Sequence, residues 1–89
     1  MEFHVLKESK TELSFELLGE THTFCNILKD ELQKVKGIVI ATYKIEHHLV
    51  GIPTFYIETK AIEPRKALKE ALSNLKKKVT EFHKEIAKL

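Results

Sequence analysis

Residues 21–36 read THTFCNILKDELQKVK, and the spacing of their apolar residues decides how the rest of the chain is arranged. Those apolar residues recur three and four positions apart, which is typical of an amphipathic helix. They are Phe24, Ile27, Leu28, Leu32 and Val35. Gly37 follows, where a helix C-terminus favours a left-handed residue. The sequence therefore predicts a helix over 21–36 that ends at Gly37.

Segments of alternating apolar and polar residues lie on both sides of this helix and predict four strands. The strands are expected at 2–7, 11–18, 38–47 and 54–60. In the third strand, the side chains expected to face inward are those of Val39, Ala41, Tyr43 and Ile45. A loop that carries Gly51 and Pro53 separates the third strand from the fourth.

Pro64 suits the first turn of a final helix that runs to the C-terminus. The predicted order is therefore β-β-α-β-β-α, an α+β fold in which 1–89 form one domain. Four amphipathic strands make an antiparallel sheet, and both helices cover its one apolar face in a two-layer sandwich.

The final helix carries an unbroken heptad pattern of apolar residues, which alternate at spacings of four and three. They are Leu68, Leu72, Leu75, Val79, Phe82, Ile86 and Leu89. About 26 residues would span roughly 39 Å, and a domain of this length has a diameter near about 31 Å. We expect the helix to extend beyond its own domain and to require a partner surface. The alternative is a helix that frays after Phe82 and lies wholly over the sheet.

The first helix has a wide apolar face of about 160°, compared with the roughly 100° that one buried face requires. Glu31 falls inside this arc, either at a contact with a second body or at the rim of a monomer. The residues expected at a subunit interface are Phe24, Cys25, Ile27, Leu28, Glu31, Leu32, Leu75, Val79, Phe82 and Ile86.

Catalysis and metal binding find little support in the sequence. His22 and Cys25 supply only two ligands, whereas structural zinc takes four. No glycine-rich phosphate loop or nucleophile motif is present. We therefore expect no catalytic, cofactor-binding or metal-binding residues, and an interaction module instead of an enzyme.

Charge and cysteine content bound the location and partners of the chain. The net charge of +2 and the single arginine disfavour sequence-specific nucleic-acid contact, and no segment is apolar enough to cross a membrane. One unpaired cysteine suits a reducing compartment, so a cytoplasmic location is expected. Two alternative functions remain open: a nucleic-acid-binding α+β module that uses Lys76–Lys78 and the strand face bearing Tyr56, and a homodimeric scaffold.

Two motifs resemble those of a known family. GETHTFCNILKDEL (19–32) and ATYKIEHHLVGIPTFYIETK (41–60) resemble the two signatures of the small alpha-like subunit of archaeal and eukaryotic RNA polymerases, called L in archaea. The residues that match its motifs outside the apolar set are His22, Thr23, Asn26, His47, Gly51 and Pro53. Three residues depart from the family pattern. His48 stands where the family usually has proline, Phe24 replaces the commoner leucine, and Lys29 stands where arginine is frequent.

This resemblance implies a noncatalytic subunit of DNA-directed RNA polymerase, a nucleotidyltransferase complex that carries out DNA-templated transcription. It implies a heterodimer with the larger alpha-like subunit, called D in archaea, and through it contact with the large catalytic subunits. In the family, the first and last helices make most of the dimer contact. The isolated chain is expected to self-associate through the same helices.

Overall fold

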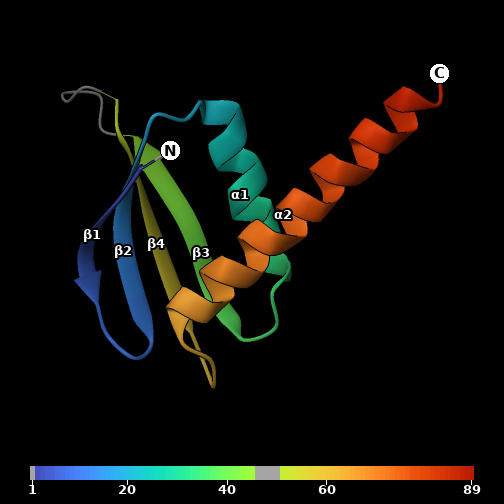
Figure 1. Cartoon of the computed structure of the whole chain (residues 1–89). Helices are drawn as coiled ribbons and strands as arrows, with labels where there is room; N and C mark the ends of the chain where they lie inside the picture. Colours follow the sequence, from blue (N-terminus) through green and yellow to red (C-terminus); the bar gives the residue numbers. More distant parts are fainter. Residues whose placement is uncertain (1, 46–50) are drawn as a thin grey trace.

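The computed structural model describes residues 2–45 and 51–89, and it contains the expected elements in the expected order (Figure 1). They are β1 (Glu2–Glu8), β2 (Glu12–Leu18), α1 (His22–Lys34), β3 (Ile38–Ile45), β4 (Pro53–Thr59) and α2 (Pro64–Ala87). The strands form one sheet in the order β1-β2-β4-β3, and every neighbouring pair is antiparallel. The predicted α+β architecture is confirmed.

Both helices cover the same face of the sheet, as Figure 1 shows. The two middle strands supply most of the core, because alternate residues of β2 and β4 point toward the helices. Phe15 and Phe55 stack with ring centroids 5.1 Å apart. From the helices, the fully buried side chains are Cys25, Leu28, Leu32, Ala67 and Ala71. The two small alanines let α2 approach the sheet closely at its first turns.

Each edge strand contains an irregularity in its pairing. In β3, Ile38 pairs with Thr59 and Ile40 with Glu58, so Val39 is an extra residue opposite a single step of β4. The prediction that Val39 faces inward is therefore wrong: its side chain is 56% exposed, and Ile38 packs on the core instead. The pairing of β1 shifts in the same way around Leu6, whose side chain is 57% exposed.

The first helix is shorter than the sequence pattern predicted. The Thr21 hydroxyl accepts a hydrogen bond from the Phe24 amide at 3.1 Å and caps the N-terminus. At the other end the helix stops at Lys34, because Val35 takes an extended conformation and buries its side chain in the core. Gly37 does have a positive φ of 99°, but it lies in the turn to β3 and does not cap the helix.

The last helix begins at Pro64, as predicted, and continues past the sheet. Leu68 and Leu72 pack on the core, but every residue from Lys76 onward is exposed. We call residues 76–89 the overhang. Figure 1 shows that the overhang extends beyond the sheet. The molecule is correspondingly elongated, with extents of 44 × 35 × 17 Å along its principal axes. The alternative, a helix that lies wholly over the sheet, is wrong.

Candidate docking surface

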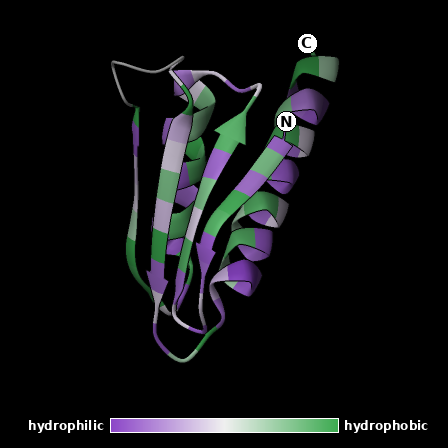
Figure 2. Cartoon of the chain, turned by 90° about the vertical axis from the view of Figure 1, so that its left-hand side faces the viewer, coloured by the Kyte–Doolittle hydropathy of each residue, from purple (hydrophilic) through white to green (hydrophobic). Residues whose placement is uncertain are grey.

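The overhang carries a stripe of large apolar side chains that no described part of the chain covers. Val79, Phe82 and Ile86 are 50%, 63% and 50% exposed, and Leu89 at the C-terminus is fully exposed. They continue the heptad pattern of Leu68 and Leu72, which are packed on the core. In Figure 2 apolar green and polar purple segments alternate along the whole of α2. One face of a single helix thus changes from core to surface along its length.

A buried carboxylate joins α1 to α2 where the overhang begins. The Lys78 ammonium donates a hydrogen bond to Glu31 Oε1, and Lys34 Nζ lies 3.7 Å from the same oxygen. Glu31 is only 5% exposed. The hydrogen bond from Lys78 holds the pKa of the Glu31 carboxyl below its usual range, because it stabilises the charged form more than burial disfavours it. Of the two positions predicted for Glu31, a contact with a second body or the rim of a monomer, neither describes it: the carboxylate is buried and its partner, Lys78, is in the same chain.

The N-terminal end of α1 and the C-terminal end of α2 diverge (Figure 1). On both of these ends apolar side chains are exposed. On α1, Ile27 lies one turn before Glu31 and is 43% exposed, and Phe24 lies one turn further and is half-buried. On α2, Phe82 lies one turn after Lys78. We call Phe24, Ile27, Val79, Phe82 and Ile86 the α1–α2 surface. The Glu31–Lys78 pair lies where its two arms, the apolar residues of α1 and those of α2, come together.

Three residues expected at the interface lie elsewhere. Cys25, Leu28 and Leu32 are fully buried in the chain's own core, so their side chains offer no surface to a partner. The sheet covers this half of the wide apolar arc, and Ile27 is on the half left open. Burial also raises the pKa of the Cys25 thiol, which disfavours the reactive thiolate. Leu75 is partly buried, where α2 leaves the core.

The motif residues at the start of α1 sit at the opposite end of that helix from the ion pair. The Tyr43 hydroxyl lies 2.5 Å from His22 Nδ1, and the two rings meet edge to face. Thr23 and Asn26 are exposed. Gly51 has a φ of 74°, and Pro53 begins β4 with its side chain buried. His47 and the departure at His48 lie outside the described residues.

Neither metal binding nor membrane insertion gains support from the described residues. Across 2–45 and 51–89, no three His, Cys, Asp or Glu side chains converge as metal ligands would. Within the same part of the chain, no helix combines the length and apolar composition needed to cross a bilayer.

Lys78 is the residue of this surface that the sequence analysis missed. It was considered only within the lysine run 76–78 as a nucleic-acid contact. Its position directly before Val79, at the flank of the heptad stripe, was the available signal, because flanking heptad positions commonly carry ion pairs.

Comparison with known proteins identifies the family of this fold and surface. Residues 12–85 match the family described as RNA polymerase Rpb3/Rpb11 dimerisation domain. The chain belongs to this family. The match includes Glu31, Lys78 and the overhang as far as Glu85. A dimerisation domain of this noncatalytic type implies a partner polymerase subunit.

Individual relatives are archaeal Rpo11 subunits of DNA-directed RNA polymerase. The one from Methanothermobacter thermautotrophicus is 39% identical over 89 residues, which cover the full length of both chains. The one from Methanosarcina barkeri is 39% identical over 82 residues, covering 92% of this chain and 89% of the relative. These similarities assign the chain to the Rpo11 type of polymerase subunit.

A solved structure has the same fold. The crystal structure of DNA-directed RNA polymerase subunit L from Thermoplasma acidophilum superimposes with a TM-score of 0.88. It is 24% identical in sequence, and the match covers 98% of this chain and 86% of that chain.

Proposed function

We propose that this chain pairs with the larger alpha-like polymerase subunit, called D in archaea. The heterodimer then serves as the platform on which the large catalytic subunits assemble for DNA-templated transcription. Family membership supports the class of partner, and the exposed apolar stripe of α2 supports the mode of contact. A cytoplasmic location, inferred from the unpaired Cys25, is part of the same proposal.

The α1–α2 surface is suited to receive helices of the partner. Val79, Phe82 and Ile86 follow one another at spacings of three and four, the pattern that a facing helix packs against. Each is about half exposed, so covering the remainder would contribute roughly 1 kcal/mol per side chain. The Glu31–Lys78 pair fixes the point at which the two arms separate.

The observation that carries this proposal is Phe82. An aromatic side chain that is 63% exposed on a helix free of the core gains little for the isolated chain, because no described residue covers it. Buried aromatic residues are enriched among the side chains that contribute most to protein–protein binding. We therefore expect Phe82 to be a main anchor of the heterodimer.

The test is a binding measurement between the full chain and the larger alpha-like subunit, with two variants of matched charge. Phe82→Asp is expected to weaken binding at least about 30-fold, because a carboxylate would be buried without a partner. Thr80→Asp adds the same charge on the polar side of the overhang and should bind as the unmodified chain does. Leu28→Asp is unsuitable, because Leu28 belongs to the core and its loss would unfold the chain.

Equal binding by Phe82→Asp and the unmodified chain would exclude the α1–α2 surface as the heterodimer contact. Both variants should keep the circular dichroism spectrum of the parent, since neither residue is in the core.

A further inference from the structure

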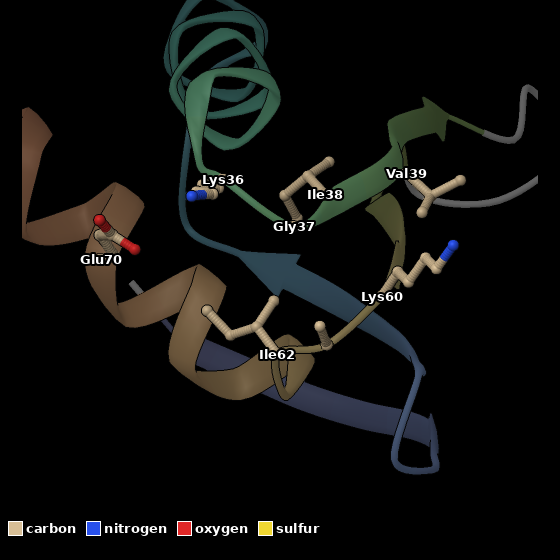
Figure 3. Close-up of a pocket in the computed structure, with 8 residues that line it drawn as sticks. Lys36, Gly37, Ile38, Val39, Lys60, Ile62 and Glu70 are labelled. Carbon is tan, nitrogen blue, oxygen red and sulfur yellow. The ribbon is translucent and has the colours of Figure 1, made fainter.

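A second apolar surface lies beside the bulge in β3, far from the overhang. A shallow pocket of about 660 Å³ opens between the start of β3 and the connection from β4 to α2. Figure 3 shows it with Ile38 and Ile62 at its centre, Lys36 and Glu70 toward one end, and Val39 and Lys60 toward the other. We call it the β3 pocket. Neither the family match nor the proposed heterodimer contact assigns it a role.

The backbone holds this pocket in a fixed shape. The Lys60 amide donates to the Gly37 carbonyl at 2.8 Å, and the Thr59 hydroxyl donates to the Ile62 carbonyl at 2.5 Å. A Cβ at Gly37 would overlap the Cγ2 of Ile62, so glycine is required by space as well as by its φ. Ala61 has a φ of 68°, which is uncommon for a residue with a side chain. The two loops are therefore locked together, and a ligand would meet a preformed surface.

The bulge supplies the exposed apolar area. Because Val39 is the extra residue, both Val39 and Ile40 are turned outward, 56% and 42% exposed. A regular strand would have placed only one of two consecutive residues on the outside. Val39 lines the pocket with the half-buried Ile38 and Ile62, and Ile40 follows Val39 along the exposed face of the strand.

The charge at the mouth selects the partner. The ammonium groups of Lys36 and Lys60 are exposed, and neither has an ion-pair partner within residues 2–45 and 51–89. Glu70 is the one carboxylate in the lining, so a second copy docked about a two-fold axis would bring four lysines to face two glutamates, which disfavours self-pairing. Nucleic acid is disfavoured as well, because no aromatic ring lines the pocket and the only arginine, Arg65, is paired with Glu8.

Addition of a strand to the edge of β3 is also disfavoured. The Gln33 side chain donates to the Ala41 carbonyl at 3.2 Å and so occupies a backbone acceptor that an added strand would need. Bulges further limit regular edge pairing. The remaining way for a partner to bind at this edge is through side-chain contacts in the pocket.

We propose that the β3 pocket is a second docking surface, which receives a loop of another polymerase subunit with an apolar side chain between carboxylates. The apolar side chain enters between Ile38 and Ile62, and the carboxylates pair with Lys36 and Lys60. This inference rests on the proposed function, since a platform needs one contact for its dimer partner and another for what it carries.

Both surfaces can be occupied at the same time. Ile62 lies two residues before α2, and Phe82 lies 18 positions after the first residue of that helix, a separation of about 27 Å along its axis. A partner on the overhang therefore leaves the β3 pocket open.

The test is stepwise reconstitution with the full chain: the larger alpha-like subunit is bound first, and the large catalytic subunits are added to the purified heterodimer. Val39→Glu should leave the affinity for the larger alpha-like subunit unchanged and weaken capture of the catalytic subunits at least about tenfold. Lys36→Glu combined with Lys60→Glu should do the same and should abolish the salt sensitivity of that step.

The chain offers a matched control in Leu6→Glu. Leu6 is also the extra residue of an edge-strand bulge and is equally exposed, but it lies on β1 at the opposite edge. The control should assemble as the unmodified chain does. If the heterodimer forms and Val39→Glu then assembles as Leu6→Glu does, the β3 pocket is not a docking surface, whereas the proposed function stands. If the unmodified chain fails to form the heterodimer, the proposed function fails and this inference with it.

Discussion

Glu31 illustrates how much depends on one side chain at the junction of the two helices. Its carboxylate is buried, and its strongest partner, Lys78, comes from the other helix. A buried charge without a partner is costly, so the pair favours one placement of α2 over α1. Because the overhang starts at this point, the ion pair also orients the apolar stripe that follows it.

Replacing Lys78 by methionine should lower the urea midpoint of unfolding at pH 7, because Glu31 would keep only the longer contact with Lys34. Lys77→Met is the control, since the Lys77 side chain is exposed and makes no ion pair with Glu31; it should leave the midpoint unchanged. Equal midpoints for the two variants would show that the pair does not stabilise the fold.

The pH dependence of stability should follow the lowered pKa of Glu31. A carboxyl group whose pKa is depressed in the folded state contributes stability above its unfolded value, near 4.5, and loses it as pH falls through the folded value. Unfolding measured from pH 7 to pH 3 should therefore show a decline below pH 4.5 that is less steep in Glu31→Gln. A parallel decline in both proteins would assign the acid sensitivity to other carboxylates.

At the scale of elements, α2 has two parts with different surroundings, an N-terminal part packed on the sheet and the overhang. The first turns of α2 bury Ala67 and Ala71 against the sheet, and every residue of its last turns, from Lys76 onward, is exposed. Helix propensity alone gives marginal stability to segments of this length, so the overhang depends on continuity with the anchored turns.

Removal of residues 79–89 should therefore separate folding from binding. No buried side chain is lost, so the free energy of unfolding is expected to change by less than about 1 kcal/mol. Binding to the larger alpha-like subunit should be lost, since Val79, Phe82 and Ile86 are gone. Calorimetry and a binding assay on the same preparation would check both statements; a large loss of stability would mean that the overhang supports the fold.

The elements also show what the sequence could and could not predict. Periodicity predicted all six elements, because a buried face imposes its period on the chain. It misplaced Val39, since a bulge changes the face of a residue without changing the alternation of the sequence. It assigned Leu28 and Leu32 to the interface with Ile27, since a helical wheel shows how wide an apolar arc is but not which part a sheet covers. The position of Lys78 beside the heptad stripe favours an ion pair, but no local pattern reveals that its partner is Glu31 on the other helix.

At the scale of the whole molecule, the isolated chain exposes the apolar stripe of the overhang on a helix that carries a net positive charge. The helix of the overhang is itself basic, because Lys76, Lys77, Lys78, Lys84 and Lys88 outnumber Glu81 and Glu85. Apolar burial would draw two copies together, and the like charges would oppose them.

We accordingly expect weak self-association that strengthens with salt. Sedimentation equilibrium of the isolated chain should show a mass that rises with protein concentration, and more steeply at about 500 mM salt than at about 50 mM, because salt screens the lysines. Phe82→Asp should remain monomeric throughout. A parent chain that is monomeric under every condition would mean that the overhang does not pair with itself.

The overhang also distinguishes an unassembled copy from an assembled one, because only the unassembled copy exposes its apolar side chains. Until a partner covers them, the last three turns of α2 are a short, frayable segment with large apolar side chains, the kind of segment that chaperones and proteases engage. Binding would cover those side chains and protect the segment in one step. The side chains that we propose as the contact with the partner would thus also link the lifetime of the subunit to its assembly.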